Sequence, residues 1–98
     1  SPASAAAVSE EIFAHPSEAG LYAAGAQVRK KVDQALASRK YEQALREIAA
    51  LREPVDRFFD DVMVMAEEPA LRENRLALLA EIAAIFSGFA DFSAIATE

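Results

Sequence analysis

The stretch LREPVDRFFDDVMVMAE, residues 51–67, decides how this chain folds. Proline suits the first position of a helix because it loses no hydrogen bond there, so the stretch predicts a helix from Pro54 to about Ala66. Its apolar side chains cover a wide face, which predicts a central place in a helical bundle. These side chains are Val55, Phe58, Phe59, Val62, Met63 and Met65. The methionines are interpreted as core, with a soft, adaptable contact surface as the alternative.

Amphipathic patterns on both sides of this stretch predict three further helices. The predicted helices cover residues 18–37, 41–52, 54–66 and 69–87. The first carries a stripe at steps of three and four, made of Leu21, Gly25, Val28, Val32, Ala35 and Leu36. Gly20 and Gly25 each disfavour a helix by up to about 1 kcal/mol relative to alanine. A neighbouring helix that passes close to them would explain both glycines.

Capping and helix-breaking residues set the predicted ends of these helices. Ser9 can cap a short helical turn over residues 10–13, and Pro16 ends that turn because the residue before proline avoids helical angles. Ser17 is the predicted N-cap of the first long helix. Gly88 is a natural stop for the last helix. Beyond it, the apolar residues would fold back over the bundle as a short tail; these are Phe89, Phe92 and Ile95.

Length and composition agree with a single helical domain. Ninety-eight residues allow one domain, and 53% apolar residues are enough for a packed core. Strand-forming β-branched residues are sparse. Short joints between amphipathic helices favour antiparallel neighbours. The fold class predicted is all-α, an antiparallel bundle of about four helices with a short N-terminal helical turn. Residues 1–8 are predicted to be a flexible tail and residues 9–98 the helical domain.

The residue inventory gives no basis for catalysis or metal binding. The chain has no cysteine and one histidine, which disfavours a zinc site and any nucleophilic triad. His15 is interpreted as a surface loop residue. Asp56 and Asp60 share a helix face, but ion pairs explain them better than a divalent cation or acid–base chemistry. No apolar run reaches 18 residues, so no membrane span is expected. No catalytic residue, metal site or cofactor is predicted for this chain.

A basic segment interrupts a chain whose net charge is −6. Residues 29–46 hold six basic residues against Asp33 and Glu42. Five of the basic residues flank the first joint beside Tyr41, and they are Arg29, Lys30, Lys31, Arg39 and Lys40. Cations on phosphates with an aromatic ring for stacking can grip a single-stranded RNA loop. The alternative is a solvated helix end whose cations compensate the helix dipole.

The stretch 51–67 also resembles a signature of the bacterial glycyl-tRNA synthetase β subunit. The resemblance extends to LRENRLALL at residues 71–79, to Ile85-Phe86 and to FADFS at residues 89–93. It covers residues 12–93 and implies a helical anticodon-binding domain, similar to the DALR domain of arginyl-tRNA synthetase. It further implies that a separate α subunit carries out aminoacylation with glycine, ATP and Mg²⁺. The expected partners are tRNA(Gly) and that α subunit, the expected location is the cytoplasm, and the fragment itself is expected to be non-catalytic.

The residues expected to contact RNA come from two places. One is the basic segment around the first joint, and the other is the set of polar residues in the stretches that carry the family resemblance. Arg52 and Arg75 could pair with Asp56 and Asp60 inside the bundle or face the RNA instead. A protein-interaction or structural bundle without RNA contact is the alternative function. A stand-alone enzyme has no supporting residues. The predicted RNA-binding residues are Arg29, Lys30, Lys31, Arg39, Lys40, Tyr41, Arg52, Arg72, Asn74 and Arg75.

Overall fold

Helices make up all the regular structure in the described part of the chain. The structure is a computed structural model that describes residues 7–96, with side chains described as far as residue 91. A short 3-10 helix, η1, precedes four α-helices; the bounds are η1 Glu10–Ile12, α2 Pro16–Ala37, α3 Tyr41–Ala49, α4 Arg52–Asp61 and α5 Pro69–Ala96. The prediction of an all-α chain with a short N-terminal helical turn is therefore confirmed.

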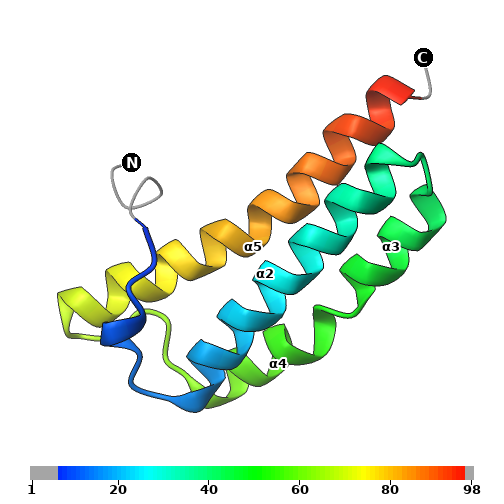
Figure 1. Cartoon of the computed structure of the whole chain (residues 1–98). Helices are drawn as coiled ribbons and strands as arrows, with labels where there is room; N and C mark the ends of the chain where they lie inside the picture. The colour runs from blue at the N-terminus through cyan, green and yellow to red at the C-terminus, as the bar shows by residue number, and fades with distance from the viewer. Residues whose placement is uncertain (1–6, 97–98) are drawn as a thin grey trace.

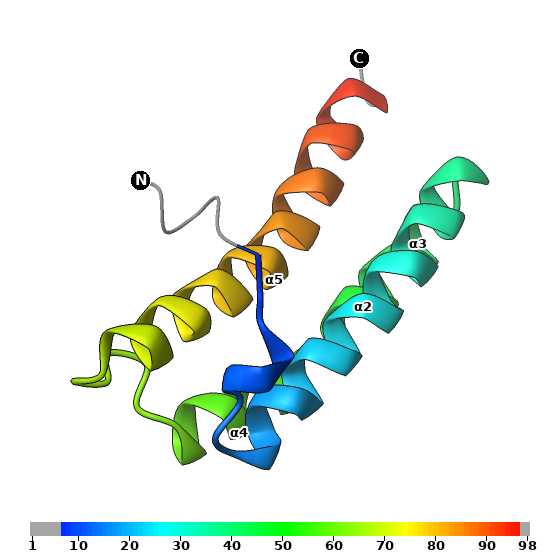
Figure 2. The ribbon, with the colours of Figure 1, turned by 60° about the vertical axis from the view of Figure 1, so that its left-hand side comes forward.

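The helices pack as three rods, because α3 and α4 follow one another with only residues 50–51 between them. The predicted second helix, 41–52, therefore ends earlier than expected, at Ala49. α3 runs antiparallel to α2, as predicted for a short joint (Figure 1). α5 runs in roughly the same direction as α2, and the α3–α4 rod is the return path between them (Figures 1 and 2). The prediction of four separate antiparallel rods is wrong in this respect.

The central helix is α2, which packs against α3, α4 and α5. Its predicted stripe is buried throughout and forms the middle of the core. The prediction that the apolar helix after Pro54 is central is wrong, because Phe58 is its one buried residue. The remaining core residues come from α3, from the two residues that flank α4 and from α5, and they include Ala44, Leu51, Val62, Leu78, Ile82 and Ile85.

The chain leaves the helical conformation after Asp61, five residues before the predicted end at Ala66. Val62 has the extended angles φ −129° and ψ 136°. Val62 is buried and Val64 packs partly against the core, whereas Met63 and Met65 are 71% and 63% exposed. In an extended segment successive side chains point to opposite sides, which accounts for this alternation. The interpretation of the two methionines as core is therefore wrong.

The three glycines of the chain differ in their surroundings. α5 continues through Gly88, and no described glycine has positive φ, so the predicted stop there is wrong. Phe92 therefore belongs to the helical backbone rather than to a returning tail, and its side chain, like that of Ile95, lies outside the described part. A Cβ atom at Gly25 would lie 2.5 Å from Cδ1 of Ile82, which confirms the predicted close approach, whereas nothing lies within 4 Å at Gly20.

α2 begins at Pro16 with His15 as its N-cap, rather than at Glu18 after Ser17. The Nδ1 atom of His15 accepts a hydrogen bond from the Ser17 amide at 3.0 Å. His15 is exposed, as predicted, but it has this structural role as well. Ser9 is the N-cap residue of η1, as predicted, but its side chain makes no capping hydrogen bond. Residues 1–6 of the predicted tail lie outside the described residues.

Candidate nucleic-acid interface

The joint between α2 and α3 holds an arginine in a conformation that favours glycine. Arg39 has φ 59°, and it is the one non-glycine residue with positive φ in the described chain. The turn is closed by hydrogen bonds from the Arg39 amide to the Leu36 carbonyl at 3.0 Å and from the Lys40 amide to the Ala35 carbonyl at 2.8 Å. This is the Schellman arrangement, in which glycine is the usual residue at the position of Arg39. An L-residue there costs about 1 kcal/mol or more.

A polar hollow of about 460 Å³ lies beside this turn, between the end of α2 and the first turns of α3. Lys31 and Lys40 line it from the two helices. Three uncharged polar side chains also line it and were missed in the sequence; they are Gln34, Ser38 and Gln43. The sequence held a signal for Gln34 and Ser38, because residues 31, 34 and 38 lie three to four apart on one helix face. Glu47 and Ala35 complete the lining.

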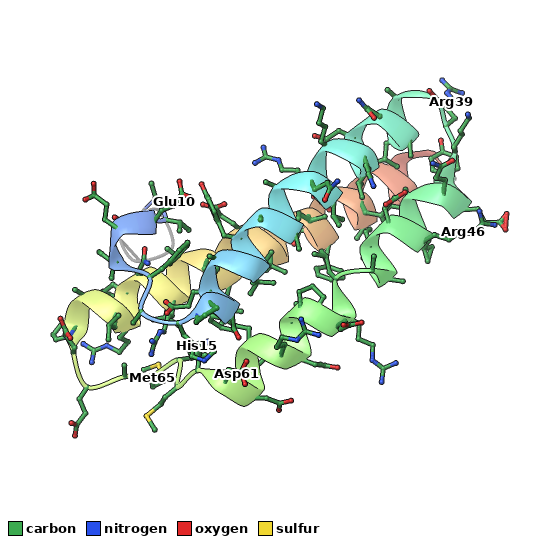
Figure 3. All side chains as sticks on the ribbon, turned by 60° about the horizontal axis from the view of Figure 1, so that its bottom comes forward. Glu10, His15, Arg39, Arg46, Asp61 and Met65 are labelled. Atoms are coloured by element: carbon green, nitrogen blue, oxygen red, sulfur yellow. The ribbon has the colours of Figure 1, made fainter. Side chains whose placement is uncertain are left out.

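We call the basic and uncharged polar residues of this turn and hollow the joint cluster; the carboxylate of Glu47, which also lines the hollow, is not counted in it. Amide side chains carry both donors and acceptors, and hydroxyl groups do so as well. Surrounded by cations, they can hydrogen-bond the edges of unpaired bases while the cations contact phosphates. Figure 3 shows Arg39 at the tip of the joint. The joint cluster consists of Lys31, Gln34, Ser38, Arg39, Lys40 and Gln43.

Three other predicted residues near the joint face elsewhere. Successive helical residues are about 100° apart, so Arg29, Lys30 and Lys31 diverge around α2. Arg29 lines an apolar groove of about 520 Å³ between α2 and α5, where Ile85 and Phe89 also lie. Lys30 is exposed. Tyr41 is half-buried and packs against the core.

Arg52 and Arg72 lie away from the joint cluster and from each other. Nε of Arg52 is 3.7 Å from Oδ2 of Asp56, and both side chains are largely exposed. The predicted Arg52–Asp56 pair therefore exists, but on the surface rather than inside the bundle. Arg72 Nη1 donates to the Ala66 carbonyl at 3.2 Å and holds the segment between α4 and α5.

Asn74 is buried and binds the start of the described chain. Its Oδ1 accepts from the Ser9 amide at 2.7 Å, and its Nδ2 donates to the Ser9 carbonyl at 3.0 Å. This pair of bonds fixes the segment that precedes η1 against α5.

Arg75 is buried and pairs with Glu18, so neither of its two expected roles, a pair with Asp56 or Asp60 or a contact with RNA, describes it. Its Nε lies 3.2 Å from Glu18 Oε2, its Nη2 lies 3.3 Å from Glu18 Oε1, and its Nη1 donates to the Met63 carbonyl at 2.7 Å. Glu18 Oε1 also accepts from the amides of Ala14 and His15, each at 2.9 Å. The guanidinium thus joins α5, the start of α2 and the segment after α4.

Burial and hydrogen bonding act in opposite directions on Glu18. Burial alone would raise its pKa, but the hydrogen bonds from Arg75 and from the amides of Ala14 and His15, together with the charge of Arg75, lower the pKa below its ordinary value. Glu18 is therefore a buried carboxylate that stays charged at neutral pH.

The predicted basic set is thus divided by the fold. Lys31, Arg39 and Lys40 come together at the joint, whereas the other cations are dispersed or buried. Among the described residues, no three His, Cys, Asp or Glu side chains gather closely enough to hold a metal ion. Within the same part of the chain, no helix is long and apolar enough to cross a membrane.

Comparison with known proteins identifies the family. The DALR anticodon binding domain family matches residues 2–91. The chain is 56% identical over 86 residues, 88% of its length, to the glycine–tRNA ligase β subunit of Desulforudis audaxviator (strain MP104C), of which it covers 12%. It is 48% identical over 94 residues, 96% of its length, to the protein of the same name from Anaeromyxobacter dehalogenans (strain 2CP-C), of which it covers 13%.

The chain thus spans about an eighth of the length of these curated relatives. No solved structure matches the chain. The match to the family extends from the start of the chain through most of α5, and it confirms the resemblance found in the sequence. The chain belongs to the DALR anticodon binding domain family, and its relatives are glycine–tRNA ligase β subunits.

Proposed function

We propose that this domain binds the anticodon arm of tRNA(Gly) through the joint cluster, as part of a glycine–tRNA ligase β subunit. The observation that carries the proposal is a polar hollow lined by Lys31 and Lys40, with Arg39 in the turn beside it, in a chain of the anticodon-binding family. The net charge of the whole chain is −6, so its overall field does not attract a phosphate backbone and binding depends on a local cluster of cations.

The joint cluster offers the two kinds of contact that an RNA loop needs. Lys31, Arg39 and Lys40 supply cations for phosphates. Gln34, Ser38 and Gln43 supply donors and acceptors for the edges of unstacked bases. We assign Tyr41 to the support of this turn through its packing on the core. Stacking of a base on the remaining exposed part of its ring stays a prediction.

Arg39 gives the proposal its most specific support. Glycine would fit the left-handed turn without steric penalty, so the arginine side chain is present at a cost in stability. Strained backbone positions are concentrated at functional sites. An exposed guanidinium at the tip of a turn is well placed to contact a phosphate group.

The other predicted RNA contacts receive different roles in this proposal. Asn74 and Arg75 are buried, and we assign them to positioning the chain start, α2 and the segment after α4. Arg29, Lys30, Arg52 and Arg72 lie outside the joint cluster. Contacts from them require RNA that wraps beyond the joint.

The remaining parts of the proposal concern the longer protein. The relatives are about eight times longer than this chain. The family resemblance implies a separate α subunit for aminoacylation, so we assign glycine activation with ATP and Mg²⁺ to that subunit. The domain would act in the cytoplasm by helping to select tRNA(Gly).

A binding experiment with matched lysine variants tests this function. The chain is titrated with tRNA(Gly) and with the same tRNA carrying a swapped anticodon, at several salt concentrations. We expect tighter binding of tRNA(Gly). Lys31→Ala combined with Lys40→Ala should weaken binding and reduce the log–log salt slope by roughly 0.7 to 0.9 for each phosphate that the variant no longer neutralises.

Lys30→Ala is the matched control, because Lys30 is exposed and adjacent in sequence but points away from Lys31. It should leave affinity nearly unchanged. Equal affinity for both tRNAs would remove the anticodon-reading role. Equal effects of the Lys30 and the Lys31/Lys40 variants would remove the joint cluster as the contact surface.

A structural or protein-interaction domain without RNA contact is the second candidate function. The exposed apolar side chains Phe59, Met63 and Met65 favour it. Absence of any salt-sensitive tRNA binding, with binding to another protein retained, would support this candidate over the first.

A further inference from the structure

Three large apolar side chains are exposed together at the end of α4. Phe59 is 53%, Met63 71% and Met65 63% exposed. Phe59 lies in the last turn of α4, and the two methionines follow on the extended segment. We call these three residues the methionine face. Figure 3 shows Met65 and Asp61 at the opposite end of the molecule from Arg39.

The methionine face is held in place rather than left loose. Val62 and Val64 turn inward to the core, and this fixes the outward direction of both methionines. Arg75 donates to the Met63 carbonyl at 2.7 Å, and Arg72 donates to the Ala66 carbonyl at 3.2 Å. The segment is thus bound at two carbonyls by side chains from α5.

The hydroxyl group of Ser17 also donates to the Asp61 carboxylate, which ties the end of α4 to the start of α2. A fixed segment that exposes two methionines fits a contact surface better than a mobile loop does.

The sequence that carries the methionine face is acidic, apart from Arg72 and Arg75 of α5, whose guanidinium groups bind carbonyl oxygens of this segment. Residues 59–68 contain four carboxylates and no lysine or arginine; the carboxylates are Asp60, Asp61, Glu67 and Glu68. An acidic border repels phosphate groups, so RNA does not fit this face. It suits an apolar protein surface bordered by lysine or arginine, because complementary charges at the rim orient such contacts.

We propose that the methionine face docks onto an apolar, basic-bordered surface of another domain of the same β subunit. This inference rests on the proposed placement of the chain in a longer subunit, whose relatives extend well beyond the part covered here. The distance between the two ends of the molecule leaves the joint cluster free while the methionine face is covered (Figure 3).

Methionine oxidation tests the docking directly, because Met63 and Met65 are the two methionines of the chain. Hydrogen peroxide adds one oxygen atom to each exposed methionine, giving the sulfoxide. The oxidation rate of each is measured by mass spectrometry in the 98-residue chain and in the complete β subunit, both without tRNA. We expect fast oxidation in the chain alone and a decrease on the order of tenfold in the complete subunit.

Equal rates in the two proteins would overturn the docking. Protection that arises only after tRNA is added would overturn it in favour of RNA. Protection in the chain alone that increases with protein concentration would overturn it in favour of a second copy. Because the measurement contains no tRNA, failure of the proposed tRNA binding would leave its result unchanged.

A pair of variants with matched exposure provides the second test. Phe59 and Leu45 are both 53% exposed, but Leu45 lies on α3 outside the methionine face. Phe59→Gln should increase the oxidation rate of both methionines in the complete subunit at least severalfold, whereas Leu45→Gln should not. Unchanged thermal unfolding of the isolated chain would show that both variants fold. Identical oxidation rates in the two variants would contradict the docking.

Discussion

Replacement of Glu18 by glutamine should destabilise the domain strongly. Glu18 is fully buried, and its carboxylate accepts from Arg75 and from two backbone amides. A glutamine that keeps its oxygen at the Oε1 position would turn its NH₂ group toward Nε of Arg75, where two donors face each other. Arg75 would then be a buried charge without its partner.

Breaking a buried ion pair from one side costs about 3 to 5 kcal/mol. The free energy of unfolding of a small domain is about 5 to 15 kcal/mol, so Glu18→Gln should remove a large share of the stability. The corresponding decrease in Tm is roughly 12 to 40 °C for a domain of this size. Urea unfolding of the variant and the unchanged chain at pH 7 measures the difference.

The double variant Glu18→Gln with Arg75→Met separates the ion pair from general damage. It keeps an acceptor for the amides of Ala14 and His15 but removes the buried charge. It should therefore recover much of the stability, since an apolar replacement of a buried pair is often nearly neutral. If the single variant lowers the free energy of unfolding by less than about 1 kcal/mol, Glu18 and Arg75 are not a stabilising buried pair.

The pH dependence of stability gives the same prediction a second readout. The pKa of Glu18 is lowered in the folded state, so its contribution is present above the ordinary pKa of 4.5 and is lost as pH falls through the folded value. The unchanged chain should lose this contribution below about pH 4.5, and Glu18→Gln should show a flatter profile there. Identical profiles would contradict the lowered pKa.

Three smaller predictions concern single residues. Gly20→Ala should raise the free energy of unfolding by about 0.5 to 1 kcal/mol, because nothing lies within 4 Å of the added Cβ. Gly25→Ala should lack this gain, because its Cβ would meet Ile82 Cδ1 at 2.5 Å; an equal gain at both positions in urea unfolding would contradict the close approach. Asn74→Ala should cost about 1 to 3 kcal/mol through its bonds to Ser9 and should increase amide exchange at Ser9, and unchanged exchange there would contradict its role.

The buried face of α2 could be predicted from the sequence, because it depends only on the spacing of apolar residues within one helix. Residues at steps of three and four must share a helix face, so Leu21, Val28 and Val32 were placed correctly. The same reasoning failed for α4, where two apolar faces were counted as one. Val55 and Phe58 face the core, whereas Phe59 is exposed.

The ends of α4 and α5 depend on information that local patterns lack. The segment after Asp61 is fixed by Arg72 and Arg75, which come later in the chain. Gly88 permits a left-handed stop but does not require one, so the helix continues.

The candidate site was only partly predictable for the same reason. Lys31, Arg39 and Lys40 were found because they are close in sequence across one joint. The burial of Arg75 could not be found, because its partner Glu18 lies 57 positions away. The side-chain amides of Gln34 and Gln43 were missed because RNA contacts were sought mainly among charged residues.

The joint cluster is tested most directly by Arg39→Gly, with unfolding and tRNA(Gly) affinity measured on the same sample. Glycine relieves the left-handed strain, so the free energy of unfolding should rise by about 1 kcal/mol. The affinity for tRNA(Gly) should fall roughly fivefold, since the variant removes one cation from the proposed RNA-binding surface. Opposite signs in the two measurements are expected if Arg39 contacts RNA, whereas unchanged affinity in a stabilised variant would contradict RNA binding at the joint.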